Sequence, residues 1–489
     1  MKKLAIIGAG PGGLAAGMIL SHLGHEVTLY EKDSRVGGRS QALLLGDYRF
    51  DVGPTFLMYV ALLEEVFQSS GYDLHQEMNL LPIDPLYRLV FPNVTWEPGM
   101  DEGKNVMMYE SYRKGLGASY LRWKREQKDK LAVITPLLKR PFKTIFDYIK
   151  MDTLRALPKL HPFQSVYTSL KHINDTPEFI HSLSFQAKYL GMASFSAPSA
   201  FTFLPYLEHA FGLYHVEGGL NKINEKMAEL LKKNGGTLLL NTPVEKILVQ
   251  DKKAYGVQVK GEEILYDDVI LNADFSYAMN HLIDAKYLKK YHPKALEKKD
   301  YSVSTMNLYL GLDKVFDFAH HQIVFSKDYD TYLTKLLHGE FTDDLSYYIH
   351  NPVILDPTMA PKGHSALYIL APIPNLRSEK DWETYQLAME KTIYQSIKER
   401  LGIDLEPHIR EKKIITPKDW EQDHHVYLGA VFNLSHKLSQ MMHLRPHNQF
   451  EEIKNLYLVG GGTHPGSGLP TIYQSALLLK HYFKGKDDK

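Results

Sequence analysis

Residues 3–39 read KLAIIGAGPGGLAAGMILSHLGHEVTLYEKDSRVGGR and contain, in order, a strand, a glycine loop, a helix, a second strand and an acidic residue. The apolar run at residues 4–7 is typical of a buried parallel strand. Gly8, Gly10 and Gly13 follow it in G-x-G-x-x-G spacing as the helix begins. This order predicts a dinucleotide-binding unit, in which a pyrophosphate lies on the unpaired N–H groups of the helix N-terminus.

Glu31 ends the second strand of this unit, where dinucleotide-binding folds carry an acidic residue. A carboxylate there accepts hydrogen bonds from ribose hydroxyls and repels a 2′-phosphate, so NADP is disfavoured. The alternative for the loop alone is an ordinary glycine turn between a strand and a helix. The strand, the helix and the acidic residue together favour the nucleotide site.

Two segments after Glu31 resemble motifs of one large flavoprotein group. Residues 36–39 (VGGR) resemble the extended motif of the group that contains amine oxidases, protoporphyrinogen oxidases and carotenoid desaturases. Residues 50–55 (FDVGPT) resemble the D-x-G-P segment that runs near the flavin in carotenoid desaturases. The resemblance implies FAD as the cofactor. The residues expected to bind it in this part of the chain are Gly8, Ala9, Gly10, Pro11, Gly12, Gly13, Glu31, Lys32, Gly38, Arg39, Pro54 and Thr55.

A second glycine-rich loop, at residues 460–470, lies between a predicted strand and a predicted helix. Its THPGSGLP sequence resembles the C-terminal motif of bacterial carotenoid desaturases of the phytoene desaturase type. With residues 415–422 (ITPKDWEQ) and 360–363 (APKG), the chain looks most like the diapophytoene branch, which acts on C30 carotenoids, and the resemblance covers essentially the full chain. Further expected FAD contacts are Val244, Gly462, Leu469, Pro470 and Thr471. For Val244, a strand core residue is an equal alternative.

Two features depart from the desaturase pattern. Residues 460–462 are three consecutive glycines, where many desaturases have a small residue between two glycines. Residues 214–219 (YHVEGG) resemble the related diaponeurosporene oxygenases more than the desaturases. Three activities therefore stay open: desaturation of a carotenoid precursor, oxidation of a carotenoid terminal methyl group, and non-enzymatic escort of an isoprenoid, as in the Rab GDP-dissociation inhibitors on the same scaffold.

The chemistry implied by the resemblance is removal of two hydrogens from an apolar carotenoid precursor, by hydride transfer to flavin and proton loss. Such a substrate has no charged group, so its binding must come from a long apolar tunnel. His464 is the candidate catalytic residue because its motif lies beside the flavin in the resembling family, and a histidine that bonds its own loop is the alternative. Asp147 and Asp152 are candidates for acid or base, against ordinary ion pairing.

Composition describes a globular protein of two or three domains. The 489 residues carry 57 basic and 57 acidic side chains and no cysteine, so nucleic-acid binding, disulfides and thiolate metal sites are not expected. The adjacent histidines His424 and His425 have no H-x-x-x-H partner, and we expect no metal site. A strand that begins at Lys3 and the lack of a long apolar run predict a cytoplasmic protein without a targeting peptide or a spanning helix. The oligomeric state is not indicated.

The predicted fold is α/β, with a Rossmann-like FAD-binding domain of the amine oxidase and GDI type and a discontinuous substrate domain. The FAD-binding domain is expected at residues 1–75, 216–300 and 448–489, and the substrate sheet at 76–110 and 301–447. Within these ranges, residues 106–108 and 304–312 are predicted to be strands, residues 221–233 a helix, and residues 381–401 a helix with Glu390 facing water. Residues 111–215 are expected to form a helical lid that faces the membrane. Within it, residues 121–160 carry eleven basic and four acidic side chains mixed with aromatics, a composition typical of peripheral association with an anionic membrane.

Overall fold

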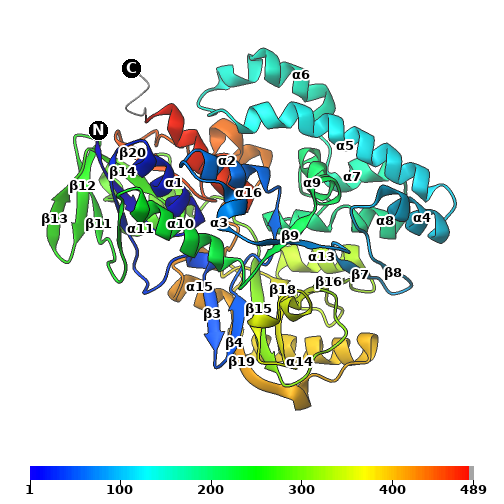
Figure 1. Cartoon of the computed structure of the whole chain (residues 1–489). Helices are drawn as coiled ribbons and strands as arrows, with labels where there is room; N and C mark the ends of the chain where they lie inside the picture. Colours follow the sequence, from blue (N-terminus) through cyan, green and yellow to red (C-terminus); the bar gives the residue numbers. More distant parts are fainter. Residues whose placement is uncertain (484–489) are drawn as a thin grey trace.

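The computed structural model describes residues 1–483 and contains two main sheets with a helical region beside them (Figure 1). The first sheet is parallel, in the order β10-β2-β1-β14-β20. Its strands are β1 (Lys3–Ile7), β2 (Glu26–Tyr30), β10 (Thr237–Leu239), β14 (Asp268–Leu271) and β20 (Leu456–Leu458). Three stretches of chain that are far apart in sequence therefore meet in one sheet.

Both faces of the parallel sheet are covered, which explains the continuous apolar run in β1. Leu4 and Ile6 pack beneath helices α1 (Pro11–His22), α10 (Asn221–Lys233) and α16 (Leu469–Leu477). Ala5 and Ile7 face the opposite side. There the sheet packs against the antiparallel strands β11 (Lys246–Gln250), β12 (Lys253–Val259) and β13 (Glu262–Leu265).

The second main sheet has seven strands in the order β19-β15-β18-β17-β16-β7-β8. They are β7 (Arg88–Val90), β8 (Thr95–Trp96), β15 (Ser304–Leu312), β16 (His321–Val324), β17 (Tyr347–His350), β18 (Ser365–Ile373) and β19 (Ile409–Ile415). Strands β16 and β7 pair in parallel, and the other neighbours pair antiparallel. All nine residues of β15 are buried, so this strand lies at the centre of the second core.

Two small sheets join the main ones. Strand β9 (Leu213–Val216) pairs with both β5 (Leu57–Met58) and β6 (Leu80–Ile83). The hairpin β3 (Ala42–Leu45) and β4 (Tyr48–Asp51) packs on β18 and β19. A Cβ at Gly311 would lie 2.7 Å from the Tyr48 ring, so the hairpin approaches β15 as closely as a glycine permits.

The helical region lies beside the seven-stranded sheet, apart from the parallel sheet (Figure 1). Its helices are α4 (Glu102–Tyr112), α5 (Leu116–Leu138), α6 (Met151–Leu160), α7 (Val166–Lys171), α8 (Pro177–Ser182) and α9 (Phe203–Phe211). Tyr109, Tyr120 and Trp123 are fully buried between them, and their rings stack or tilt on one another 5.2 to 5.5 Å apart. Aromatic packing therefore holds α4 and α5 together.

Several predicted elements are confirmed, and two predictions are wrong. The helix at Asn221–Lys233 and the strand at Ser304–Leu312 have the predicted bounds. A strand predicted at residues 106–108 instead lies inside α4, where Asp101 caps the helix by accepting from the Lys104 N–H. Glu390 of α14 (Trp382–Leu401) was expected to face water but is 9% exposed, because it accepts from the Tyr394 hydroxyl and the Lys412 ammonium.

The predicted domain boundaries stay a prediction. The two main sheets do take their strands from alternating stretches of chain, the pattern on which that division depends. The last predicted segment, 448–489, extends past the described residues.

Candidate active site

The first glycine loop turns sharply between β1 and α1. Gly8 has φ +98°, a conformation that favours glycine, and its N–H donates to the Tyr30 carbonyl at 2.8 Å. A Cβ on Gly13 would lie 2.1 Å from the Gly8 carbonyl oxygen, so Gly13 is needed for packing within the protein. Gly10 differs, because the nearest atom to its absent Cβ is the Asn272 side chain at 3.1 Å and the next is 4.0 Å away. Apart from the Asn272 amide, no protein atom comes within 4.0 Å of this position, which fits the close approach of a phosphate to the Gly10 backbone.

Glu31 lies at the C-terminal end of β2, directly beside this loop. Its carboxylate accepts from the Ala9 N–H at 2.7 Å and from the Asp33 N–H at 3.0 Å, and the side chain is 6% exposed. Burial raises the pKa of Glu31, while the two N–H donors oppose that shift. Lys32 points to other partners, the Asp33 carboxylate and the Asp423 carbonyl, each at 2.8 Å.

Asn272, at the end of β14, joins the three parts of the nucleotide site, and the sequence analysis missed it. Its amide donates to the Gly8 carbonyl at 3.0 Å. Its Oδ1 atom would lie only 2.6 Å from a Cβ on Gly12 and 2.9 Å from one on Gly460. The available signal was a polar residue directly after a buried parallel strand, which is where ligand-binding residues of α/β sheets lie.

A buried arginine holds the C-terminal glycine loop. Arg445 is completely buried and donates to the carbonyls of Gly461 at 2.8 Å and Thr463 at 3.1 Å. Burial lowers its pKa to about 10, so it stays charged at neutral pH. Ser475 of α16 accepts from the Gly460 N–H at 2.9 Å. The loop shape is therefore set by residues outside its own motif.

A cavity lies between the C-terminal glycine loop and the seven-stranded sheet. Five of the predicted FAD-binding residues line it: Arg39, Pro54, Thr55, Leu469 and Pro470. Apolar and aromatic side chains make most of the remaining wall, namely Phe56, Met58, Phe185, Tyr189, Val303, Ile323, Tyr347, Tyr348, Tyr368, Leu370, Trp420, Val431, Phe432 and Ile472. The predicted residues Val244 and Lys32 do not line this cavity, and Val244 precedes β11 without belonging to it.

Arg39 and Lys188 are the two basic side chains of the cavity wall. Arg39 donates to the Val431 carbonyl at 2.7 Å and lies close to Asp274, so a counter-charge is provided. Lys188 donates to the Ser346 hydroxyl at 3.0 Å and lies over the Tyr329 ring. Burial lowers the pKa of Lys188 to about 7. Lys188 belongs to no sequence motif, and only the fold shows that it lines the cavity.

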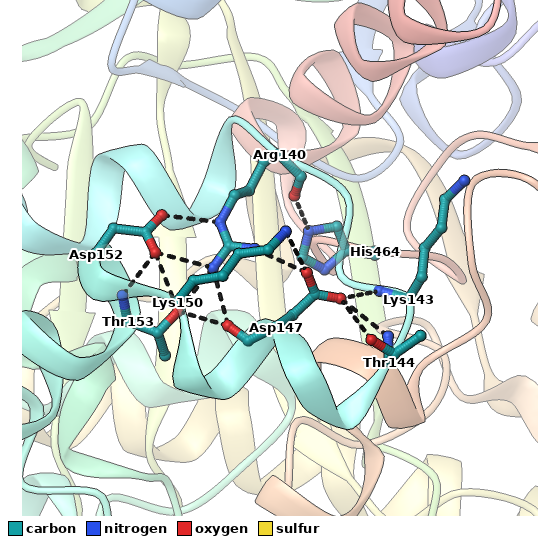
Figure 2. A network of polar contacts seen from close by, with 8 residues as sticks. All are labelled: Arg140, Lys143, Thr144, Asp147, Lys150, Asp152, Thr153 and His464. Carbon is teal, nitrogen blue, oxygen red and sulfur yellow. Dashed lines mark hydrogen bonds and ion pairs between the residues drawn. The ribbon is translucent and has the colours of Figure 1, made fainter.

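His464 belongs to the C-terminal glycine loop but is not among the residues that line the cavity. Its Nε2 atom is 3.1 Å from the Arg140 carbonyl (Figure 2). Its Nδ1 atom has no partner, and the ring tilts on Phe142. Burial lowers the pKa of His464 to about 4, so the ring is neutral at physiological pH. These contacts resemble those of a structural histidine more than those of a catalytic one, but the bonded carbonyl belongs to Arg140 and not to the loop that contains His464. A catalytic role of His464 stays a prediction.

Asp147 and Asp152 belong to an ion-pair network around Arg140 (Figure 2). The guanidinium donates to Asp147 at 3.1 Å and to Asp152 at 2.9 Å. Burial alone would raise the pKa of Asp147, but the bonds from Lys150 and from backbone N–H groups lower it overall. Both carboxylates are therefore held as structural anions, the alternative that the sequence favoured.

Three histidines from separate strands also meet in the interior. One ring nitrogen each from His215, His320 and His350 lies within 4.8 Å of the other two. Burial lowers the pKa of His320 and His350, so their rings are neutral. The expectation of no metal site depended on spacing along the chain, which does not reveal this proximity.

Comparisons with known proteins agree with this architecture. The model of the flavin containing amine oxidoreductases matches residues 11–478. A 4,4′-diapophytoene desaturase (4,4′-diapolycopene-forming) of Methylomonas sp. is 41% identical, over 99% of this chain and 97% of its own length. The all-trans-zeta-carotene desaturase of Myxococcus xanthus is 36% identical, over 99% of this chain and 93% of its own length.

Among solved structures, an oxidoreductase from Methanosarcina mazei superposes with a TM-score of 0.64 at 16% identity, covering 98% of this chain and all of that one, which supports the fold alone. Within residues 1–483, no helix is both long enough and apolar enough to cross a membrane. The chain therefore belongs to the flavin-containing amine oxidoreductase family and, within it, to the carotenoid desaturases, and it is an FAD-dependent oxidoreductase.

Proposed function

We propose that this chain desaturates a C30 carotenoid precursor of the diapophytoene class. The observation that carries this proposal is the cavity, whose wall is mostly apolar and aromatic, has Arg39 and Lys188 as its two basic side chains, and includes five of the predicted FAD-binding residues. A polyene offers no polar group for recognition, so its affinity must come from burial, at about 0.8 kcal/mol for each CH₂. The similarity to a 4,4′-diapophytoene desaturase supports the substrate class.

We infer that FAD binds along the loop from Gly8 to Gly13, with its ribose at Glu31 and its ring toward Arg39, Pro54, Thr55 and Leu469. Bound FAD supplies the acceptor for the hydride that leaves the substrate. The chain supplies an open phosphate cradle at Gly10 and a buried carboxylate with lone pairs left for ribose hydroxyls.

We further propose Lys188 as the acceptor of the proton lost from the substrate. It is a titratable side chain on an otherwise apolar wall, and burial lowers its pKa to about 7. Above that pH the amine is neutral and has a lone pair, whereas Arg39 stays charged and cannot accept a proton. The Ser346 hydroxyl and the Tyr329 ring position the amine.

The product of the reaction tests the proposed function. Cells that make a colourless C30 precursor should gain long-wavelength polyene absorption when this chain is expressed, with no oxygen in the product, and a parallel C40 strain should respond less. Mass spectrometry and absorption spectra of the extracts measure this outcome. Aldehyde or acid end groups on an already conjugated substrate would instead establish the oxygenase activity.

Loss of FAD from two variants tests the cofactor site. Glu31→Ala removes the ribose acceptor and should weaken FAD binding about 10- to 100-fold, as expected for a hydrogen bond to a charged group. Gly10→Val places a side chain in the phosphate cradle and should have at least that effect. Glu26→Ala, at the exposed start of the same strand, is the matched control. The flavin-to-protein ratio is the measurement, and full occupancy in both variants contradicts the assignment.

The pH profile of a third variant tests the proton acceptor. With Lys188 as a base, kcat/KM of the wild type should rise with pH through about 7 and then level off, since only the neutral amine accepts a proton. Lys188→Met should lower the plateau roughly 100-fold and remove the rise. Lys327→Met changes an exposed lysine and is the control. An unchanged pH profile in Lys188→Met assigns the base elsewhere.

We also propose that residues 145–163 dock on a membrane, since substrate and product dissolve only in lipid. Apolar side chains are unusually exposed here, and they are Ile145, Phe146, Ile149, Met151, Leu154, Leu157 and Phe163. Phe163 is 98% exposed and Phe146 is 69% exposed. These residues flank and include α6, at the outer edge of the helical region (Figure 1).

The basic residues at 121–160 interact largely with acidic side chains of the protein itself. Lys124 pairs with Glu102 at 2.7 Å, Lys139 pairs with Glu65 at 2.8 Å, and Arg140 is at the centre of the network in Figure 2. Reversing the charge of Arg140 would disrupt that network. The exposed apolar side chains are therefore the sharper target for a test of membrane docking.

A triple variant tests the membrane surface. Ile145→Ser, Phe146→Ser and Ile149→Ser together should abolish sedimentation with anionic lipid vesicles, since each large apolar side chain gains about 2 kcal/mol on burial. FAD content should not change, because all three side chains are exposed. Leu265→Ser with Leu387→Ser changes two exposed apolar residues on elements elsewhere and is the control. Equal sedimentation of the triple variant and the wild type excludes this surface.

A further inference from the structure

The three buried histidines come from strands that are distant in sequence. His215 lies in β9, His320 directly precedes β16, and His350 ends β17. Their exposed fractions are 0, 4 and 1%. The ring centroids are 5.1 Å apart for His215 and His320 and 4.9 Å apart for His320 and His350. Two sheets thus direct imidazole rings toward one point.

Each ring presents a nitrogen without a hydrogen-bond partner. These atoms are Nδ1 of His215, Nε2 of His320 and Nε2 of His350. A buried polar atom that lacks a partner costs about 1 to 3 kcal/mol. Three such atoms in one cluster point to a ligand that accepts their lone pairs.

A hydrogen bond of the second ring nitrogen of His215 determines which nitrogen carries the proton. Its Nε2 is 3.0 Å from a carboxylate oxygen of Asp356, which can only accept. The same carboxylate accepts from the Gly218 N–H at 2.6 Å and from the Thr358 hydroxyl at 2.5 Å, so its position is well determined. His215 therefore carries its proton on Nε2, and its Nδ1 atom is a lone pair.

A chain of hydrogen bonds permits the same state in His320. Its Nδ1 is 3.1 Å from Nε2 of His321, and Nδ1 of His321 is 2.5 Å from the Tyr348 hydroxyl. Tyr348 in turn is 2.7 Å from the Thr55 hydroxyl. Protons donated from His320 toward Thr55 satisfy every link and leave Nε2 of His320 as a lone pair, whereas the reverse direction protonates that atom, so a bound cation would select the first direction.

We propose that His215, His320 and His350 bind one divalent transition-metal ion of the zinc class. Neutral imidazoles suit such ions, and a carboxylate behind a histidine ligand, as Asp356 lies behind His215, is the usual support of a metal site. Tetrahedral coordination at about 2.0 to 2.1 Å brings ligand nitrogens to about 3.3 Å from one another. The three nitrogens lie within 4.8 Å of one another here, so binding of an ion would draw the rings closer together. The ion ties β9 to the seven-stranded sheet and does not depend on the proposed function.

Zinc binding by the full-length FAD-containing protein tests this inference. After removal of any affinity tag and treatment with a chelator, the protein is titrated with Zn²⁺ in a calorimeter, and bound zinc is counted by mass spectrometry. We expect one zinc per chain, and X-ray absorption at the zinc edge should show three imidazole nitrogens. Asp356→Asn should raise the Kd for zinc about 10- to 100-fold.

Two ligand variants and one control complete the experiment. His350→Gln and His215→Asn should each lose stoichiometric zinc, while His75→Gln, on an exposed histidine, should retain it. Far-UV circular dichroism checks that the variants fold. If a variant does not fold, the wild-type stoichiometry and the absorption spectrum still decide. No zinc in the wild type beyond weak surface binding, or equal binding by the folded ligand variants, would mean that the cluster holds water alone and would overturn the inference.

Discussion

The close approach of three chain segments around the Asn272 amide is the constraint on which the nucleotide site depends. The amide donates to the Gly8 carbonyl, and a side chain at Gly12, Gly13 or Gly460 would lie less than 3 Å from its atoms. Glycines in the first loop and the last loop are thus required by one residue in the middle of the chain. The parallel sheet is complete only when all three segments pack together. Packing thus explains why the domain is discontinuous in sequence.

The cavity follows from that closure. Parallel strands place their carboxyl ends at one edge of the sheet, and the loops that leave β1 and β20 are held there by Glu31, Asn272 and Arg445. The seven-stranded sheet supplies the opposite wall through side chains of β15, β17 and β18. A long apolar ligand is therefore brought beside the nucleotide site without any polar recognition, and a few titratable groups such as Lys188 gain unusual properties because they border an apolar space.

Local sequence predicted those elements in which one short-range signal dominates. The glycine spacing, the buried run of β1 and the amphipathic pattern of α10 each depend on neighbours within a few residues. The error at residues 106–108 arose because three apolar residues cannot distinguish a strand from one turn of helix. Glu390 was wrongly predicted to face water because its partner Lys412 lies on another element. Asn272, Arg445 and the histidine cluster could not be predicted from the sequence for the same reason, because only the fold brings their partners close to them.

Tyr348 connects the two halves of the molecule at the point where geometry matters most. Its hydroxyl bonds Thr55, a predicted FAD-binding residue, and His321, beside the buried histidines. Its ring is part of the cavity wall. A displacement of β17 relative to β9 would therefore move both the cavity wall and the segment that follows the first glycine loop. Transfer of a hydride requires the reacting atoms within about 3 to 3.5 Å, and displacements of about 1 Å can cost 100-fold in rate. The hydrogen bonds from His215 to Asp356 and from Tyr348 to Thr55 and His321 thus help to align an apolar substrate that no polar contact can orient.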